Sequence, residues 1–131
     1  MNDLFTEEWL TRFSRKWNND AEIVSQLAAA NFDSRVCFGY TEAPQPEVLI
    51  DIRRGSVQNA KRYDPLTDQK PDWDLRAHPE QWLKWRGNGP GIAGLGMAVA
   101  NHQLQFVAGD YRRMIRQPLL AGPFLRFFSF L

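Results

Sequence analysis

The sequence predicts one α+β domain in which helices cover one face of an antiparallel sheet. Two helical patterns over residues 4–31 precede every strand pattern. Apolar and polar residues then alternate over much of 35–62, which is typical of strands with one buried face. In 72–85 a strand pattern changes into a helical pattern within two residues. A strand that leads so directly into an apolar helix places that helix on the buried face of the sheet.

Length and charge limit the possible functions. The 131 residues suit a single domain with N-terminal helices (1–31), a sheet with central helices (35–110) and apolar C-terminal helices (111–131). Sixteen basic and fifteen acidic residues leave a net charge of +1, so we expect no nucleic-acid partner. No run reaches the roughly 20 apolar residues that a membrane-spanning helix needs.

The N-terminus and the single cysteine indicate the compartment. Residues 1–19 mix acids and bases and lack the uninterrupted apolar run of a signal peptide. Cys37 cannot form an internal disulfide and lies in an apolar strand pattern, where we expect it to be buried. We therefore expect a cytoplasmic protein.

The first elements follow from local periodicity. Leu10, Phe13 and Trp17 have helical spacing within 4–17, and Asp20 suits the N-cap of a second helix that ends near Asn31. Strands are predicted next, with the apolar faces Val36, Phe38, Tyr40 and Val48, Ile50, Ile52. Arg54 and Gly55 suit a tight hairpin turn, and the polar stretch 56–62 suits an edge strand.

The stretch 72–85 joins the sheet to a helix. Trp73, Leu75 and Ala77 alternate with Asp74 and Arg76, which predicts a strand with the latter two on its solvent face. Pro79 suits the first position of a helix capped by His78. Three large residues of this helix are expected to be buried: Trp82, Leu83 and Trp85.

The last third is apolar and glycine-rich. A loose helix is predicted over 92–100, followed by a short strand over 104–108. Asp110 suits the cap of a helix that turns Met114 inward and Arg112, Arg113 and Arg116 outward. The stretch 119–131 predicts a final helix that begins at Pro123 and must bury its aromatic side against the domain, a partner or a lipid surface.

Few residues suggest chemistry. His78 is interpreted as a cap or surface residue, His102 as a loop residue and Cys37 as a structural residue without a base partner. Four aspartates between 64 and 74 lack the spacing of a calcium loop, and the glycines of 87–96 lack the context of a phosphate loop. We therefore expect no catalytic residue, no metal site and no cofactor.

The order of elements resembles the sterol carrier protein-2 family of lipid-binding domains over 32–111. The resemblance lies in the strand around Phe38, the strand 49–53 with its turn at Arg54 and Gly55, the helix start at Pro79, and Gly109 with Asp110 after a short strand. It implies a five-stranded, mainly antiparallel sheet with helices on one face, enclosing an apolar tunnel for fatty acyl, isoprenoid or sterol-like ligands.

Three features depart from the family pattern. His78 replaces the small or acidic residue that usually precedes the proline. Alternation in 104–108 holds only up to Phe106, which predicts a bulge or one extra residue. The C-terminus is longer and more aromatic than usual, which affects the expected shape of the tunnel.

Our hypothesis is a non-enzymatic lipid-binding or transfer domain. The tunnel would lie between the sheet, the helix 79–85, the segment 92–99 and the apolar C-terminus. Its expected lining comes from all of these parts: Phe38, Ile50, Trp82, Leu83, Leu95, Met97, Phe106, Met114, Leu120, Phe124 and Phe127.

Two alternatives stay open. The C-terminal aromatics could dock on a partner or pair two copies, in a module that presents a lipid intermediate to an enzyme of isoprenoid or quinone metabolism. Alternatively, the protein could be an enzyme whose site is too diffuse to recognise, with His78 or His102 taking part. The arginines of 112–126 beside the apolar tail could also make transient contact with anionic lipid headgroups.

Overall fold

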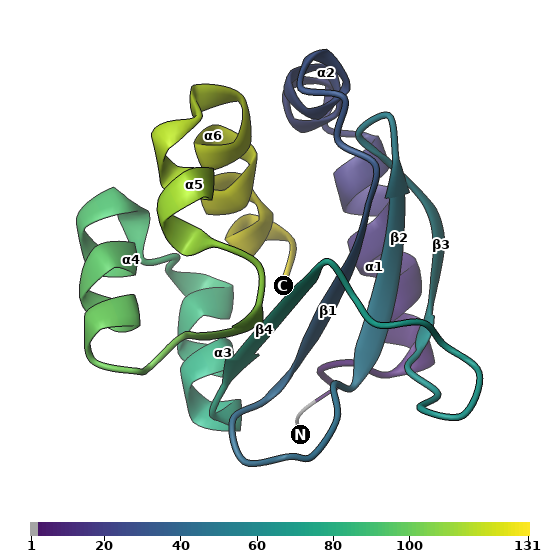
Figure 1. Cartoon of the computed structure of the whole chain (residues 1–131), viewed down its shortest axis with the longest axis vertical. Helices are drawn as coiled ribbons and strands as arrows, with labels where there is room; N and C mark the ends of the chain where they lie inside the picture. Colours follow the sequence, from purple (N-terminus) through teal and green to yellow (C-terminus); the bar gives the residue numbers. More distant parts are fainter. Residues whose placement is uncertain (1–2) are drawn as a thin grey trace.

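A computed structural model describes residues 3–131, and the chain folds around one sheet (Figure 1). The elements follow one another in this order: α1 (Glu7–Asn18), α2 (Ala21–Ala29), β1 (Ser34–Tyr40), β2 (Val48–Arg53), β3 (Ser56–Arg62), β4 (Trp73–Ala77), α3 (Pro79–Gly87), α4 (Gly91–Ala100), β5 (Gln105–Ala108), α5 (Tyr111–Arg116), α6 (Pro118–Arg126) and the 3₁₀ turn η1 (Phe127–Phe130). The predicted α+β class is confirmed.

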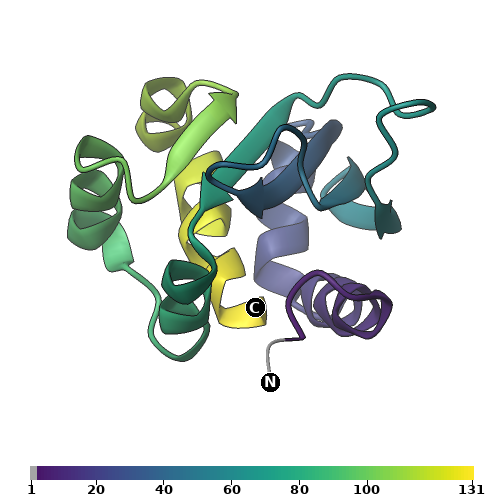
Figure 2. The same cartoon turned by 90° about the horizontal axis from the view of Figure 1, so that it is seen from below.

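The sheet has five strands in the order β3-β2-β1-β4-β5. β1 and β4 pair in parallel, and the other three pairings are antiparallel. The polar strand β3 lies at one edge, as predicted. Viewed from below, the helices lie on one side of the sheet, so its inner face is the floor of the core (Figure 2).

Strand register fixes which side chains enter the core. Phe38 of β1 lies opposite Val48 of β2 and Leu75 of β4, so these three share the inner face. All three are buried. Trp82 of α3 packs on this layer and donates from its indole nitrogen to the Gly39 carbonyl at 2.9 Å. The buried indole thus has the polar partner that it needs.

The turn between β2 and β3 attaches the edge of the sheet to the N-terminal helices. Arg54 and Gly55 have φ values of 50° and 82°, as the predicted tight hairpin requires. A Cβ on Gly55 would lie 2.4 Å from the Val24 carbonyl oxygen of α2, so only glycine fits. Trp17 of α1 donates to the Gly55 carbonyl at 2.9 Å. The close approach and this hydrogen bond hold the turn against both helices.

The bulge that the sequence predicts is present in the last pairing. Asp74 lies opposite Ala108, whereas Leu75 lies opposite Phe106, so β5 has one extra residue, Val107. This residue is 62% exposed. The bulge allows Phe106 to face Trp73, with ring centroids 6.3 Å apart.

The final helix begins earlier than predicted. α6 starts at Pro118, not at Pro123, and Pro123 lies inside it. Both prolines suit a first helical position, but Pro118 comes first, with one residue between it and the end of α5, and α6 begins there. Pro123 has no N–H for the carbonyl of residue 119, so α6 lacks one hydrogen bond in its middle. The aromatic side of η1 is buried within the chain itself.

Asp74 and Arg76 are not on a solvent face, which corrects the prediction for β4. Their exposed fractions are 3% and 4%. Arg76 donates to the two carboxylate oxygens of Asp74 at 2.6 and 2.8 Å, and to the Ala43 carbonyl at 2.9 Å. The loop after β1 therefore covers the outer face of the sheet. Gly39 permits this, because a Cβ there would lie 2.9 Å from Pro46 Cα.

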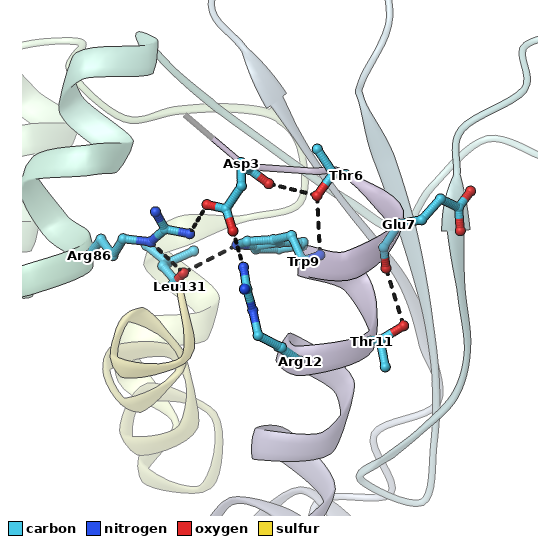
Figure 3. Close-up of polar contacts among 8 residues, drawn as sticks. All are labelled: Asp3, Thr6, Glu7, Trp9, Thr11, Arg12, Arg86 and Leu131. Atoms are coloured by element: carbon cyan, nitrogen blue, oxygen red, sulfur yellow. Dashed lines mark hydrogen bonds and ion pairs between the residues drawn. The ribbon is translucent and has the colours of Figure 1, made fainter. Parts of the chain in front are cut away.

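A polar cluster joins the N-terminal residues to α3 and the C-terminal segment (Figure 3). Asp3 forms ion pairs with Arg12 of α1 and Arg86 of α3. Arg86 and Trp9 also donate to the main-chain oxygen of Leu131, at 2.8 and 3.2 Å. Hydrogen bonds from Arg12 and Arg86 lower the pKa of Asp3 to about 2.

We expect Arg76→Met to destabilise the fold by about 3–5 kcal/mol, because it leaves the Asp74 carboxylate buried without its partner. The double variant Asp74→Val with Arg76→Met removes both charges and should recover most of this loss. Urea unfolding measures the stability of the single and the double variant. Equal losses in the single and double variants would show that the charge pair is not what matters at this site.

The Asp3 cluster should make stability depend on pH in acid. The folded pKa of Asp3, about 2, lies below the usual aspartate value of 3.8, so its contribution to stability is complete above about pH 4 and is lost as pH falls towards 2. Asp3→Asn should be less stable than the parent protein at pH 6, by at most about 1 kcal/mol because the pairs are partly exposed. The difference should vanish near pH 2 in thermal unfolding. A difference that is constant over this range would contradict the assignment.

Candidate apolar ligand site

An apolar cavity of about 50 Å³ lies between the inner face of the sheet and the C-terminal helices. Hydrocarbon or aromatic groups form its wall, and no charged side chain reaches it. The lining residues are Trp17, Leu27, Phe32, Val36, Phe38, Trp73, Leu75, Met114, Leu120, Pro123, Phe124 and Phe127. Such a surface can bind an apolar molecule but offers no group for acid, base or nucleophilic chemistry.

The floor and the roof of the cavity differ in construction. Val36, Phe38 and Leu75 come from β1 and β4, two paired strands at the centre of the sheet. The roof comes from α5, which has six residues, and from α6 with its internal proline. A paired strand deforms less easily than a short or interrupted helix, so the roof is the part of the wall that can move.

Aromatic side chains of the C-terminal segment fill most of the space between the sheet and the C-terminal helices. Phe127 stacks on Phe38 with ring centroids 5.2 Å apart, and Phe124 stacks on Phe106 at 5.5 Å. Phe124 and Phe127 meet edge to face at 5.2 Å. The C-terminal phenylalanines therefore occupy space next to the sheet that a ligand chain would otherwise take.

The cavity is too small for a lipid in this conformation. Sites for small molecules usually enclose about 300–1,000 Å³, whereas about 50 Å³ holds a few waters at most. The open tunnel that the family resemblance implies is thus not formed here. A lipid could enter only if the roof moved outward.

A depression of about 350 Å³ on the surface adjoins the cavity. Phe32, Trp73 and Leu120 line both spaces, so these half-buried side chains form the partition between them. The outer part of the depression is polar and includes Asp72 and Arg113. These three apolar side chains therefore separate the cavity from the depression.

The structure brings together some of the predicted lining residues. Phe38, Met114, Leu120, Phe124 and Phe127 line the cavity. Phe106 does not line the cavity, but it stacks on Phe124, which does. Other predicted residues are buried in the core away from the cavity, namely Ile50, Trp82 and Leu95.

Two predicted lining residues lie at the surface. Leu83 is 39% exposed and Met97 is 63% exposed. Trp82 and Trp85 take the buried side of α3, and Leu95 and Ala98 take that of α4. Leu83 and Met97 therefore face away from the interior, and their predicted place in the wall is corrected.

Several lining residues were missed in the sequence. Val36, Trp73 and Leu75 could have been found, because each has the same strand parity as a core residue that was predicted. Helical spacing places Trp17 on the apolar side of α1 but does not indicate that it lines a cavity, and the same holds for Leu27 of α2. Pro123 was interpreted as a helix start. Nothing local in the sequence indicates that Phe32 separates the cavity from the surface depression.

The candidate chemical residues lie elsewhere. Cys37 is on the outer face of the sheet, where burial raises its pKa to about 12, so it is not a nucleophile at neutral pH. Asp68 binds Lys61 at 2.8 Å and also accepts from the Asp64 amide. Within 3–131, no three His, Cys, Asp or Glu side chains gather as a metal site would require. Over the same residues, every helix is too short or too polar to cross a bilayer.

Comparison with known proteins supports the fold. No protein-family model matches the sequence, and no curated protein matches it.

Solved structures with a similar fold include the crystal structure of sterol carrier protein 2, with a TM-score of 0.69 and 19% identity over 96% of this chain and 97% of that chain. Another is the solution structure of a conserved hypothetical protein from Thermus thermophilus, described as possibly a sterol carrier protein. It has a TM-score of 0.65 and 18% identity over 96% of this chain and 87% of that chain. This chain therefore has the sterol carrier protein 2 fold, as the resemblance in its sequence predicts.

Proposed function

We propose that this protein binds a lipid with a long fatty acyl, isoprenoid or sterol-like body and carries it without chemical change. The observation that carries the proposal is the wholly apolar cavity beneath the sheet, separated from a surface depression only by Phe32, Trp73 and Leu120. The names of the two similar structures, which refer to sterol carrier proteins, support it. The reduced, buried Cys37 is compatible with a cytoplasmic site of action.

The ligand would enter by displacing the C-terminal phenylalanines. α6 lacks a hydrogen bond at Pro123, so bending it there costs less than bending an intact helix. Outward movement of Phe124 and Phe127 would enlarge the cavity, and displacement of Leu120, which also belongs to α6, would join it to the depression. Phe38, Val36 and Leu75 would stay on the sheet as the fixed floor of the site.

Approximate free energies indicate how tightly such a site can bind a lipid chain. Burial of a sixteen-carbon chain contributes about 12 kcal/mol, at about 0.8 kcal/mol per methylene group. Displacement of the buried Phe127 and the half-buried Phe124 costs up to about 3–6 kcal/mol, and association costs about 4 kcal/mol or more. The remainder, roughly 2–5 kcal/mol, corresponds to weak and reversible binding. A carrier that must also release its ligand requires such reversibility.

We expect Phe127→Ala to bind a fluorescent long-chain acyl probe roughly 10- to 100-fold more tightly than the parent protein, because the probe no longer displaces this ring. The variant should also lose about 3–5 kcal/mol of stability through the cavity that it creates. Probe titration and urea unfolding measure the two effects.

Phe128→Ala is the matched control. Phe128 is equally buried and adjacent in sequence, and it packs on Trp85 and on Phe127 without lining the cavity itself. It should lose similar stability with little gain in probe affinity. Failure of Phe127→Ala to bind the probe more tightly than both the parent protein and Phe128→Ala would refute the proposed function.

A further inference from the structure

Charge is distributed unevenly along the chain. Residues 87–131 contain four arginines and one acid, Asp110, for a net charge of +3. Residues 1–86 contain twelve basic and fourteen acidic residues, for a net charge of −2. Arg126 forms ion pairs with Asp20 and Glu22, so the excess of positive charge in this part of the chain lies on α5, although the whole protein is nearly neutral.

The two sides of α5 have different chemistry. Met114 is buried and lines the cavity, and Tyr111 and Ile115 flank it. The opposite side is the arginine face, defined as Arg112, Arg113 and Arg116, and all three side chains are exposed. None of them forms an ion pair with another residue of 3–131. The one acid nearby in sequence, Asp110, accepts a hydrogen bond from the Arg113 amide as the helix cap.

Exposed apolar side chains accompany this basic helix. Leu119, at the start of α6, is 41% exposed, and Ile92 and Met97 of α4 are each 63% exposed. α4 lies beside α5 in both views (Figures 1 and 2), and a Cβ on Gly96 would come within 3.7 Å of the Tyr111 hydroxyl. α4 has no charged residue. Exposed apolar groups next to unpaired arginines are typical of surfaces that contact a lipid headgroup layer.

We propose that the arginine face of α5 docks this protein on an anionic membrane, with Leu119 and the exposed residues of α4 entering the headgroup layer. The guanidinium groups, which form no ion pair within 3–131, bind lipid phosphates and carboxylates, although Asp33, Asp72 and Asp110 line the same depression as Arg113. Nucleic acid fits less well, because it offers no partner for the apolar groups. A protein partner is an outcome of the test below.

Docking in this orientation has a consequence for the cavity. Arg113 lines the depression outside it, and Met114, the next residue, lines the cavity itself. Contact through the arginine face would thus hold the roof of the cavity against the bilayer. This consequence depends on the proposed lipid binding, but the docking itself does not.

Flotation with lipid vesicles tests the docking. The full chain should bind mixed phosphatidylcholine and phosphatidylserine vesicles better than pure phosphatidylcholine vesicles, and less well as salt is raised. The triple variant Arg112→Gln, Arg113→Gln and Arg116→Gln should bind the anionic vesicles roughly 100-fold more weakly. Arg116→Gln alone should lose roughly fivefold.

The control is a triple variant with the same change of charge elsewhere, Arg15→Gln, Lys16→Gln and Lys70→Gln. It should bind the anionic vesicles like the parent protein, and thermal unfolding should show all variants folded. Loss of binding in this control to the same extent, or absence of any preference for anionic vesicles, would overturn the inference and leave the arginine face to a protein partner. Acyl-probe binding, measured without vesicles, tests the proposed function separately, so either idea can fail alone.

Discussion

The packing of Phe38 is the interaction on which the rest of the structure depends. Its ring, at the centre of the inner face of the sheet, meets Phe13 of α1, Trp82 of α3 and Phe127 of η1, with centroids 5.7, 5.9 and 5.2 Å away. These partners come from the beginning, the middle and the end of the chain. Because aromatic pairs contribute about 0.5–1.5 kcal/mol each beyond the area that they bury, one side chain links three distant helical segments to the sheet. The C-terminal segment is therefore part of the core and not an appendage.

This arrangement sets two demands on the same residues. Phe127 completes the core through Phe38, and it also lines the cavity where a ligand would lie. A ligand must then replace contacts that already stabilise the fold, so its affinity is limited by the protein's own side chains. The interrupted hydrogen bonding at Pro123 lowers the cost of that exchange without weakening the strands beneath it. Stability and binding are thus coupled through one short segment.

The sequence predicts the elements well and the site only in part, for physical reasons. Strand parity identified the inner faces of β1 and β2, since a two-residue period is local information. The burial of Asp74 and Arg76 was missed because alternation shows that one face is polar, not that a loop covers it. Met97 was misplaced because α4 is apolar on all sides, so no periodicity distinguishes its buried side from its exposed side. The size of the cavity depends on how far Phe124 and Phe127 reach, which only tertiary packing determines.

The two faces of the sheet explain why the route to the cavity lies on the helical side. On the outer face, the Asp74–Arg76 pair and the loop after β1 close the surface over Cys37, and opening them would leave buried charges without partners. On the inner face, the side chains of Phe32, Trp73 and Leu120 form an apolar partition, and apolar contacts can be exchanged for contacts with another apolar chain. A lipid gains free energy by that exchange, whereas water gains none. Under the proposed function, this partition would select apolar ligands by its chemistry before any shape is considered, and its position next to α5 would place it close to a bilayer in the proposed docking.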